Sequence, residues 1–464
     1  MADQPSKPSP SGRPSTQTID QAGIGSDPAT LRRVGIASFI GALVEWYDFF
    51  LYGLASALIF GPLFFPGDSP LISTLSSFAT FAVGFFARPI GGVIFGHVGD
   101  RVGRKSALVA TLVLMGTATF AIGLLPTADT LGWWAALLLV LLRVLQGVAV
   151  GGEWGGAVLM MTEHAPARRR GLYGSWPQTA SSAALLLANG LLGGLSWWLG
   201  DAAFEAWGWR IPFLISALLV VVGLVIRLRI PESPQFERVR DAAERSERPV
   251  VEALTTQQKS VALVIGLRVA ENACGYLISV FALSYVTGDL GLASSLGLLA
   301  NMAAAAVQFC LTPLYGALTD RVGRRPVYLF GAGLHAVFAV PFFLLLQTEN
   351  VVAIVVAFVI AYAVANGALF ATQPSLFSEL FGTSVRYSGI SLGYQFSAIF
   401  AGGLAPFIAT ALLAAGGGEP WLVAGYWVLL AVITFGTTLV TPETRPVLPA
   451  STSAEARAAA AGRE

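Results

Sequence analysis

Two carboxylates three residues apart, Glu45 and Asp48, lie inside a long apolar run and are the first residues whose types and spacing could do chemistry. Residues three apart share one face of a helix, so two negative charges there would repel each other. Removal from water adds to that repulsion, and one carboxyl is therefore expected to hold a proton near neutral pH. Such a group could bind and release a proton in a working cycle. Glu153, in a later apolar run, is a further candidate for this proton coupling.

Three arginines, Arg88, Arg143 and Arg268, also lie in apolar runs, and Glu271 follows the last of them by three residues. A guanidinium cannot lose its charge in a protein, so these arginines suit either binding an anion or tuning the nearby carboxyls. A static ion-pair network between helices is the alternative. Buried ion pairs stabilise less than apolar packing does, which favours the functional interpretation.

Aromatic and amide side chains in the same runs could stack on a small ring or hydrogen-bond to it, although each could equally pack one helix against another. The candidates for substrate contact, besides the charged residues, are Tyr47, Trp154, Gln178, Tyr276, Tyr394 and Gln395. The three histidines have no metal-ligand spacing and the two cysteines no CxxC neighbour, so no metal or cofactor is expected.

The amino-acid composition indicates what kind of structure must position these residues. Of 464 residues, 55% are hydrophobic and only 12% charged, and the mean hydropathy is +0.68. A soluble domain carries about 25% charged residues, and one large core cannot explain the deficit because its surface must still be wetted. These values exclude a soluble enzyme, a nucleic-acid binder and a disordered scaffold. A net charge of +1 also argues against a polyanionic partner.

Twelve apolar runs are long enough to cross a lipid bilayer, which takes roughly 20 residues each. They lie at 34–60, 72–98, 106–125, 131–162, 172–199, 211–230, 260–286, 292–318, 327–346, 351–380, 388–414 and 420–441. We therefore predict an all-α membrane protein with twelve transmembrane helices. The predicted organisation is two pseudo-symmetric six-helix bundles at 31–230 and 259–445, a cytoplasmic linker at 231–258, and disordered cytoplasmic tails at 1–30 and 446–464.

Basic residues predict the orientation. Lys and Arg concentrate in the loops at 101–105, 168–170, 227–259, 321–325 and 386, whereas the opposite loops are acidic. The excess of positive charge marks the cytoplasmic side, so both termini are predicted to be cytoplasmic. At about 1.5 Å rise per residue, Glu45, Asp48, Arg143, Arg268 and Glu271 all fall near the middle of the membrane, and Arg88 falls lower.

An internal repeat relates the two halves. Residues 96–105 (GHVGDRVGRK) recur 220 residues later as 316–325 (GALTDRVGRR), and Glu163–Arg170 recurs as Glu379–Arg386. Basic loops alone would follow from topology, but two copies at equivalent positions favour an ion-pair latch. Duplicated bundles in transporters rock around a central path, so we predict a cytoplasmic gate. Its residues are Asp100, Arg101, Arg104, Glu163, Arg170, Asp320, Arg321, Arg324, Glu379 and Arg386.

The paired GxxxDRxGR[KR] loops resemble the signature of the major facilitator superfamily, and more narrowly the chain is similar to its metabolite:proton symporters. The segments that carry this resemblance are 45–49 (EWYDF), 88–92 (RPIGG), 143–156 (RVLQGVAVGGEWGG) and 209–213 (WRIPF). Residues 386–389 (RYSG) and 393–395 (GYQ) look most like the shikimate-type branch. The resemblance implies a monomer in the plasma (inner) membrane that imports shikimate, 2-oxoglutarate, citrate or related acids, or proline and betaine.

These observations predict proton-coupled import of a small organic acid by alternating access, with no enzymatic activity. Uptake of a zwitterionic osmolyte such as proline or betaine is the alternative, and drug export is a further one. A channel is disfavoured by the paired latch loops. An enzyme is disfavoured because the sequence has no HExxH, GxSxG, Walker or Rossmann pattern in a suitable context.

Overall fold

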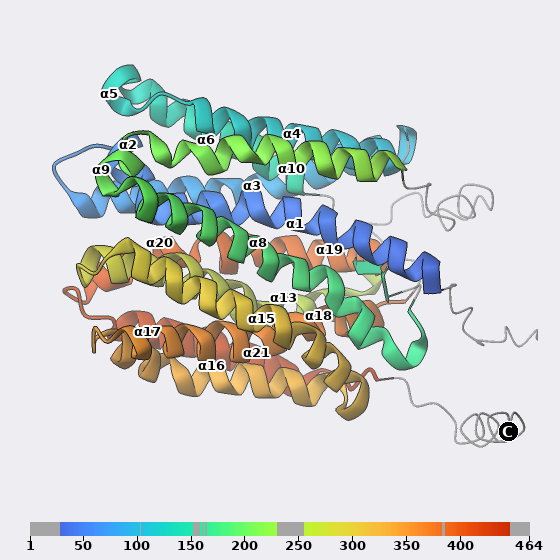
Figure 1. The fold of residues 1–464 in the computed structure, drawn as a ribbon. Coiled ribbons are helices and arrows are strands. Elements are labelled where there is room, and N and C mark those ends of the chain that lie inside the picture. Colours follow the sequence, from blue (N-terminus) through green and yellow to red (C-terminus); the bar gives the residue numbers. More distant parts are fainter. Residues whose placement is uncertain are drawn as a thin grey trace, which may run out of the picture.

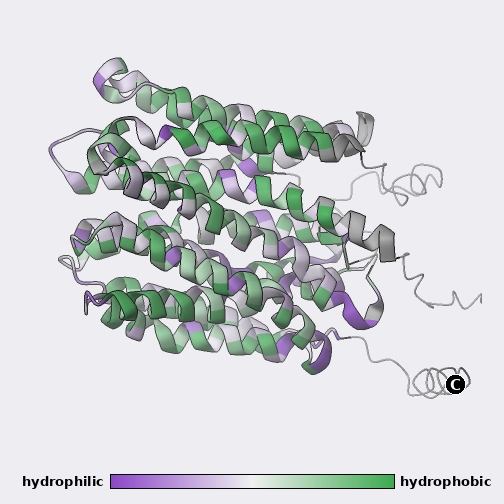
Figure 2. Cartoon of the chain, in the orientation of Figure 1, coloured by the Kyte–Doolittle hydropathy of each residue, from purple (hydrophilic) through white to green (hydrophobic). Residues whose placement is uncertain are grey.

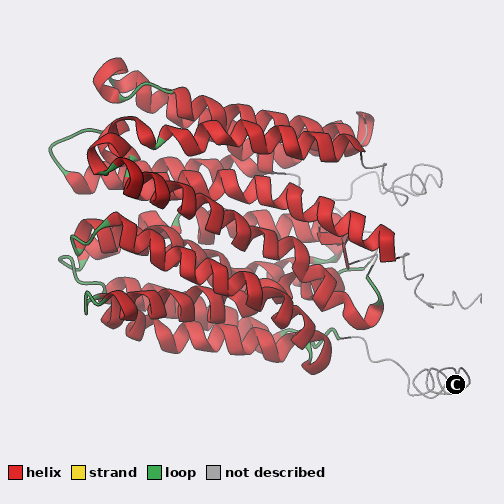
Figure 3. Cartoon of the chain, in the orientation of Figure 1, coloured by secondary structure: helices red, strands yellow, loops and turns green. Residues whose placement is uncertain are grey.

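The computed structural model describes residues 28–102, 104–151, 158–159, 161–162, 165–229, 255–382 and 386–445. Throughout these residues the chain forms helices joined by short connections and contains no strand (Figure 3). The first helix begins at Pro28, inside the stretch predicted as a tail. Residues 1–27 and 446–464 of the predicted tails, and 231–254 of the predicted linker, lie outside the described residues.

Six long helices make up the first half. They are α1 (Pro28–Leu58), α3 (Pro70–Val102), α4 (Arg104–Leu124), α6 (Trp133–Val150), α8 (Arg170–Leu199) and α10 (Arg210–Arg229). The short elements α2 (Phe60–Phe64), α5 (Ala128–Leu131), η1 (Ala167–Arg169), α9 (Asp201–Ala203) and η2 (Phe204–Gly208) connect them.

The second half repeats this plan with more irregular helices. Its uninterrupted α-helices are α15 (Ser294–Val322), α16 (Arg324–Leu346) and α21 (Trp421–Val440). Three further crossings contain π-helical turns: α13–η3–α14–η4 (Gln258–Tyr276, Leu277–Phe281, Ala282–Ser284, Tyr285–Asp289), α17–η5–α18 (Val351–Phe358, Val359–Asn366, Gly367–Leu380) and α19–η6–α20 (Arg386–Ser397, Ala398–Gly403, Ala405–Ala415). π-Turns often mark functional sites, and the first two of these three crossings contribute residues to the cavity described below.

Ten helices of the described chain are long and apolar enough to cross a membrane, and α1 and α4 complete the predicted set of twelve. The two halves lie side by side with α8 and α15 at their boundary (Figure 1). Hydrophilic residues gather at the helix ends and apolar residues along the helices (Figure 2). We call the end that carries the α15–α16 connection the basic end, and the opposite one the far end.

Small residues allow helices of the first half to approach closely. A Cβ atom at Gly91 of α3 would lie 1.8 Å from the carbonyl oxygen of Val148 on α6, and one at Gly147 would lie 2.1 Å from the carbonyl oxygen of Gly84. Close backbone approach through glycine replaces the hydrophobic effect as the driving force between helices in lipid. This contact fixes α3 and α6, which carry Arg88 and Arg143, against each other.

Candidate functional site

Two buried arginines of the first bundle share one aromatic ring. The guanidinium carbon of Arg88 lies 4.3 Å from the centre of the Phe49 ring, and that of Arg143 also lies 4.3 Å from it. Arg143 additionally lies 4.1 Å from the ring centre of Tyr52. Cation–π contacts of this kind stabilise desolvated cations without neutralising them. Helices α1, α3 and α6 thus hold two positive charges together near the middle of the bundle.

Neutral acceptors satisfy much of the hydrogen-bonding capacity of Arg143. Its Nε and Nη2 donate to the carbonyl oxygen of Phe81 at 3.4 and 3.3 Å, and its Nη1 donates to Oε1 of Gln146 at 3.1 Å. A Cβ at Gly84 would lie 2.4 Å from Arg143 Nε, so glycine is needed there for the guanidinium to fit. Glu45 is close enough to Arg88 to act on its charge electrostatically. The Arg143 guanidinium is held by neutral acceptors and aromatic rings, so its charge is available to an anion.

Asp48 is 1% exposed, and within the described part of the chain neither carboxyl oxygen has a hydrogen-bond partner. An ionised carboxylate in such a place is costly, so this environment favours the protonated form. Glu45, one turn earlier, is half-buried. Among the described midplane residues Asp48, Arg88, Arg143, Arg268 and Glu271, only Arg268 and Glu271 form an ion pair, at 3.7 Å.

Arg268 and Glu271 belong to a polar chain in the second bundle. Arg268 Nη1 donates to the carbonyl oxygen of Tyr394 at 2.8 Å, and its guanidinium lies 3.2 Å from the centre of the Tyr394 ring. Glu271 Oε2 accepts from Gln373 Nε2 at 2.9 Å. The same amide donates to the Tyr328 hydroxyl at 3.3 Å, which in turn donates to the carbonyl of Leu267. The carboxyl group is thus held by helices α13, α16 and α18.

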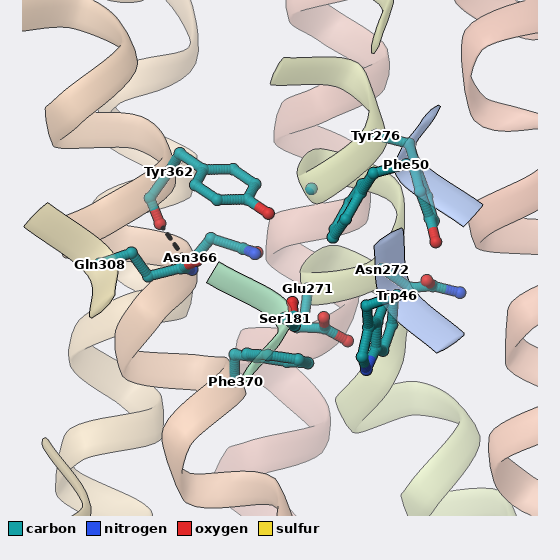
Figure 4. A pocket seen from close by; sticks show the side chains of 11 residues that line it. Trp46, Phe50, Ser181, Glu271, Asn272, Tyr276, Gln308, Tyr362, Asn366 and Phe370 are labelled. Atoms are coloured by element: carbon teal, nitrogen blue, oxygen red, sulfur yellow. Dashed lines mark hydrogen bonds between the residues drawn. The ribbon is translucent and has the colours of Figure 1, made fainter. Parts of the chain in front are cut away.

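A small cavity lies between the bundles and beside this chain of polar residues. Figure 4 shows aromatic side chains around a small number of polar groups, the composition typical of small-molecule sites. Helices α1 and α8 contribute from the first bundle, and α13, α15, η5 and α18 from the second. The lining residues are Trp46, Phe50, Ser181, Glu271, Asn272, Gly275, Tyr276, Gln308, Tyr362, Asn366 and Phe370.

Of the predicted substrate residues, Glu271 and Tyr276 line this cavity. Tyr47 is buried, and its hydroxyl donates to the carbonyl of Pro212 at 2.8 Å. Tyr394 packs on Arg268 instead of reaching the cavity. The predicted residues Glu153 and Trp154 lie outside the described residues.

The predicted glutamines bridge the two bundles. Gln178 Nε2 of α8 donates to the carbonyl of Phe370 on α18 at 3.2 Å, and Gln395 Nε2 of α19 donates to the carbonyl of Gly151 at 2.9 Å. Both are thus occupied by backbone acceptors of the opposite bundle. Ser182 adds a third bridge, because its hydroxyl donates to Oε1 of Gln308 at 2.8 Å.

Several lining residues escaped the sequence prediction of the site, among them Trp46, Phe50, Ser181, Tyr362, Asn366 and Phe370. Asn366 could have been found, because an amide is rare in a run as apolar as 351–370. The aromatic residues carry no such signal, since the surrounding helices are rich in them.

At the basic end, Asp320 of the repeated motif joins the bundles. Its Oδ1 and Oδ2 accept from the backbone N–H groups of Gly171 and Leu172 at 2.8 and 3.0 Å. These amides open helix α8, where a negative charge is favoured by the helix dipole. Arg324 donates to Asp320 at 2.9 Å and pairs with Glu379 at 3.1 Å. The Asp320 carboxylate therefore connects the two bundles at this end.

The segment after α21 packs over the same network. Glu443 accepts from the backbone N–H groups of Arg324 and Arg325 at 2.9 and 3.0 Å, and the Thr444 hydroxyl donates to Glu379 at 2.6 Å. Partial burial alone would raise the pKa of Glu443, but these backbone donors and the Arg324 charge outweigh it and lower that pKa. Gly323 has φ +107°, and a Cβ there would lie 2.5 Å from Glu443 Oε2. The glycine of the motif is therefore required twice over.

For the remaining predicted gate residues the structure gives fewer contacts. Arg386 Nε donates to the carbonyl of Phe381 at 3.3 Å, and the carbonyl of Arg321 accepts from Arg445. Arg170 begins helix α8. The side chains of Asp100, Arg101 and Arg104, and all of Glu163, lie outside the described residues. The gate role of both copies of the motif stays a prediction.

Two bundles of membrane-length helices around a central cavity define the architecture of a transporter. The family model described as the Major Facilitator Superfamily matches residues 35–392 and 265–463 of this chain. The protein therefore belongs to the Major Facilitator Superfamily, a family of transporters and not of enzymes, and it is a multi-pass membrane protein.

Characterised relatives extend over most of the chain. The shikimate transporter of Escherichia coli (strain K12) is 43% identical over 411 residues, which cover 88% of this chain and 94% of that protein. The proline/betaine transporter of the same organism is 35% identical over 439 residues, covering 92% and 87%. The inner membrane metabolite transport protein YhjE, also from E. coli, is 40% identical over 418 residues, covering 89% and 94%.

A solved structure agrees with the fold. The xylose transporter XylE from E. coli, in a partially occluded inward open conformation, superposes with a TM-score of 0.71 at 18% identity. The match covers 91% of this chain and all of that one. The predicted all-α architecture of two six-helix bundles is confirmed.

Proposed function

We propose that the protein imports a small organic acid together with protons by alternating access. The observation that carries this proposal is the buried pair Arg88 and Arg143, whose guanidinium groups share the Phe49 ring. Two such cations suit the carboxylate of a substrate. Similarity to the shikimate transporter supports a hydroxylated ring acid such as shikimate. Amides of the cavity, such as Asn366 and Gln308, can hydrogen-bond its hydroxyl groups.

Carboxyls of the first bundle are the proposed proton carriers. Asp48 is buried without a described partner, Glu45 lies one turn away, and Glu153 belongs to the same proposal. Protons moving down their gradient supply the energy, because a tenfold gradient is worth about 1.4 kcal/mol. A monoanion carried with one proton moves no net charge, so only the pH gradient drives its uptake. Inward and outward access then alternate as the Asp320 latch opens and closes.

A zwitterionic osmolyte such as proline or betaine is the second candidate. The cavity favours it, since Trp46, Phe50 and Phe370 surround a space that also holds the carboxylate Glu271. Aromatic faces beside a negative charge attract a quaternary ammonium group. The similarity to the proline/betaine transporter points the same way. Outward drug transport is the least supported direction, because the named relatives carry metabolites.

For the setting of this activity, we propose a monomer in the inner membrane with both termini in the cytoplasm. The Lys and Arg excess of the basic end supports the orientation. Scanning-cysteine labelling from either side of right-side-out vesicles tests it.

A ligand panel tests the substrate class. The melting temperature of the purified protein is measured with shikimate, 2-oxoglutarate, citrate, proline and betaine. A ligand that binds only the folded protein at 100 times its Kd stabilises it by about 2.7 kcal/mol. We expect stabilisation by a hydroxylated monocarboxylate. Stabilisation by betaine or proline alone would replace the leading proposal with the second.

A further inference from the structure

Glu271 occupies an unusual position in the cavity wall. Among the described residues that line the cavity it is the only Asp, Glu, Lys or Arg. It is 6% exposed, and Figure 4 shows its side chain among those of Ser181, Asn272 and Phe370. Asp48 and Glu45, in contrast, do not line this space. Whatever enters the cavity therefore meets the Glu271 carboxyl first among the charged groups.

The guanidinium of Arg268 neutralises the negative charge of Glu271 only in part. Arg268 Nε lies 3.7 Å from Glu271 Oε2, longer than a direct charge-assisted hydrogen bond. The same guanidinium is engaged by the carbonyl and ring of Tyr394. Gln373 donates to Glu271 Oε2 at 2.9 Å but carries no charge.

The other groups around Glu271 are neutral in the physiological range. The titratable or charged side chains that face it are Arg268, Cys274 and Tyr276 of α13, Tyr328 of α16, Tyr362 of η5 and Tyr394 of α19. Helices α1, α8, α15 and α18 present the uncharged residues Trp46, Ser181, Gln308 and Gln373. An entering ligand therefore alters the electrostatic balance between two charged groups, Arg268 and Glu271.

An organic anion in so small a space lies close to this carboxylate. Two neighbouring negative charges in a desolvated site cannot both persist, and one of them takes up a proton. We propose that Glu271 is the group at which substrate and proton meet. The cavity accepts the anion when the Glu271 carboxyl carries a proton, and Arg268 is then released to pair with the substrate carboxylate. The inference rests on the proposed function: the one proton carried per cycle is bound at Glu271 together with the substrate, and the carboxyls of the first bundle relay that proton.

The pH dependence of binding tests this coupling. Shikimate is the probe, and its Kd is measured by calorimetry on the purified wild-type protein across the neutral pH range. If binding requires one proton on Glu271, the Kd rises about tenfold per pH unit once the free protein loses that proton. Glu271→Gln is permanently neutral and should bind with a Kd that does not change with pH. Glu271→Asp keeps a titratable carboxyl and should restore the slope.

Two controls separate the loss of the Glu271 carboxyl from the loss of any other carboxyl and from unfolding. Glu419→Gln removes an exposed carboxyl near the far end and should keep the wild-type slope. Melting temperatures without ligand establish that each variant is folded. A wild-type slope that persists in Glu271→Gln overturns the inference while acid binding still supports the proposed function. If the wild type binds no acid at any pH, the proposed function fails and the inference fails with it.

Discussion

The side-chain amide of Gln178 donates to the carbonyl oxygen of Phe370 across the boundary between the bundles, at 3.2 Å. In a regular helix that carbonyl would accept from the N–H of residue 374. Residue 374 is proline and has no N–H, so the first bundle supplies the donor that the second lacks. Phe370 also lines the cavity, and its ring packs edge-on against Trp46 at 6.0 Å. The bridge therefore joins helix α8 of the first bundle to the cavity wall of the second.

Gln178→Ala should shift the protein toward opening at the basic end. The lost hydrogen bond is worth about 1 kcal/mol, or about a fivefold change in the equilibrium. The measurement is the alkylation rate of a cysteine placed at Ser181, with Cys274 and Cys310 replaced. Pro374→Ala restores an intrahelical donor for Phe370, so Gln178→Ala should have less effect in that background. Equal effects in both backgrounds would refute the role assigned to Pro374.

Asp320→Asn should loosen the basic end more strongly, because it weakens the cap on helix α8 and the contact with Arg324 together. Caps of this kind are worth about 0.5–2 kcal/mol. Spin labels at Arg169 and Val322, measured by pulsed electron resonance, report the separation of the bundles there. We expect a wider distance distribution than in the parent or in the far-end control Asp289→Asn. An unchanged distribution would remove Asp320 from the gate.

Arg143→Gln should weaken binding of the acid about ten- to a hundredfold, as expected for losing a charged hydrogen-bond donor worth about 1.5–3 kcal/mol. Calorimetry on the purified variant measures this change. Arg210→Gln, at the start of α10, serves as the control that removes a half-buried guanidinium elsewhere in the first bundle. If Arg143→Gln keeps the parent affinity, the carboxylate partner is Arg88 or Arg268.

Glu443 should contribute to stability in a pH-dependent way. Its pKa is lower in the folded protein, so its contribution is present above the ordinary pKa of a glutamate and is lost as the pH falls through the folded value. Glu443→Gln should therefore melt at a lower temperature than the parent at neutral pH. The difference should shrink as the buffer is acidified through the range where glutamate titrates. A constant difference at all pH values would show that the carboxylate charge is irrelevant.

The helices were predictable because each crossing leaves a run of apolar residues, and the repeat at Asp100 and Asp320 indicated the twofold plan. The burial of Asp48, Arg143 and Arg268 followed from their position in those runs. Side-chain pairing did not follow, since Arg143 stacks on Phe49 of another helix and no spacing encodes that distance. The π-turns in 359–366 bring Tyr362 and Asn366 to the cavity, and their geometry departs from the regular helical period used to assign faces.

Uptake of shikimate into proteoliposomes, with the pH gradient and the voltage imposed separately, tests the central claim most directly. A monoanion carried with one proton should accumulate under a pH gradient at zero voltage and barely respond to voltage alone. Asp48→Asn should lose that accumulation and keep part of its counterflow exchange, because exchange needs no net proton movement. Accumulation driven by voltage without a pH gradient, or full accumulation by Asp48→Asn, would contradict the proposed coupling.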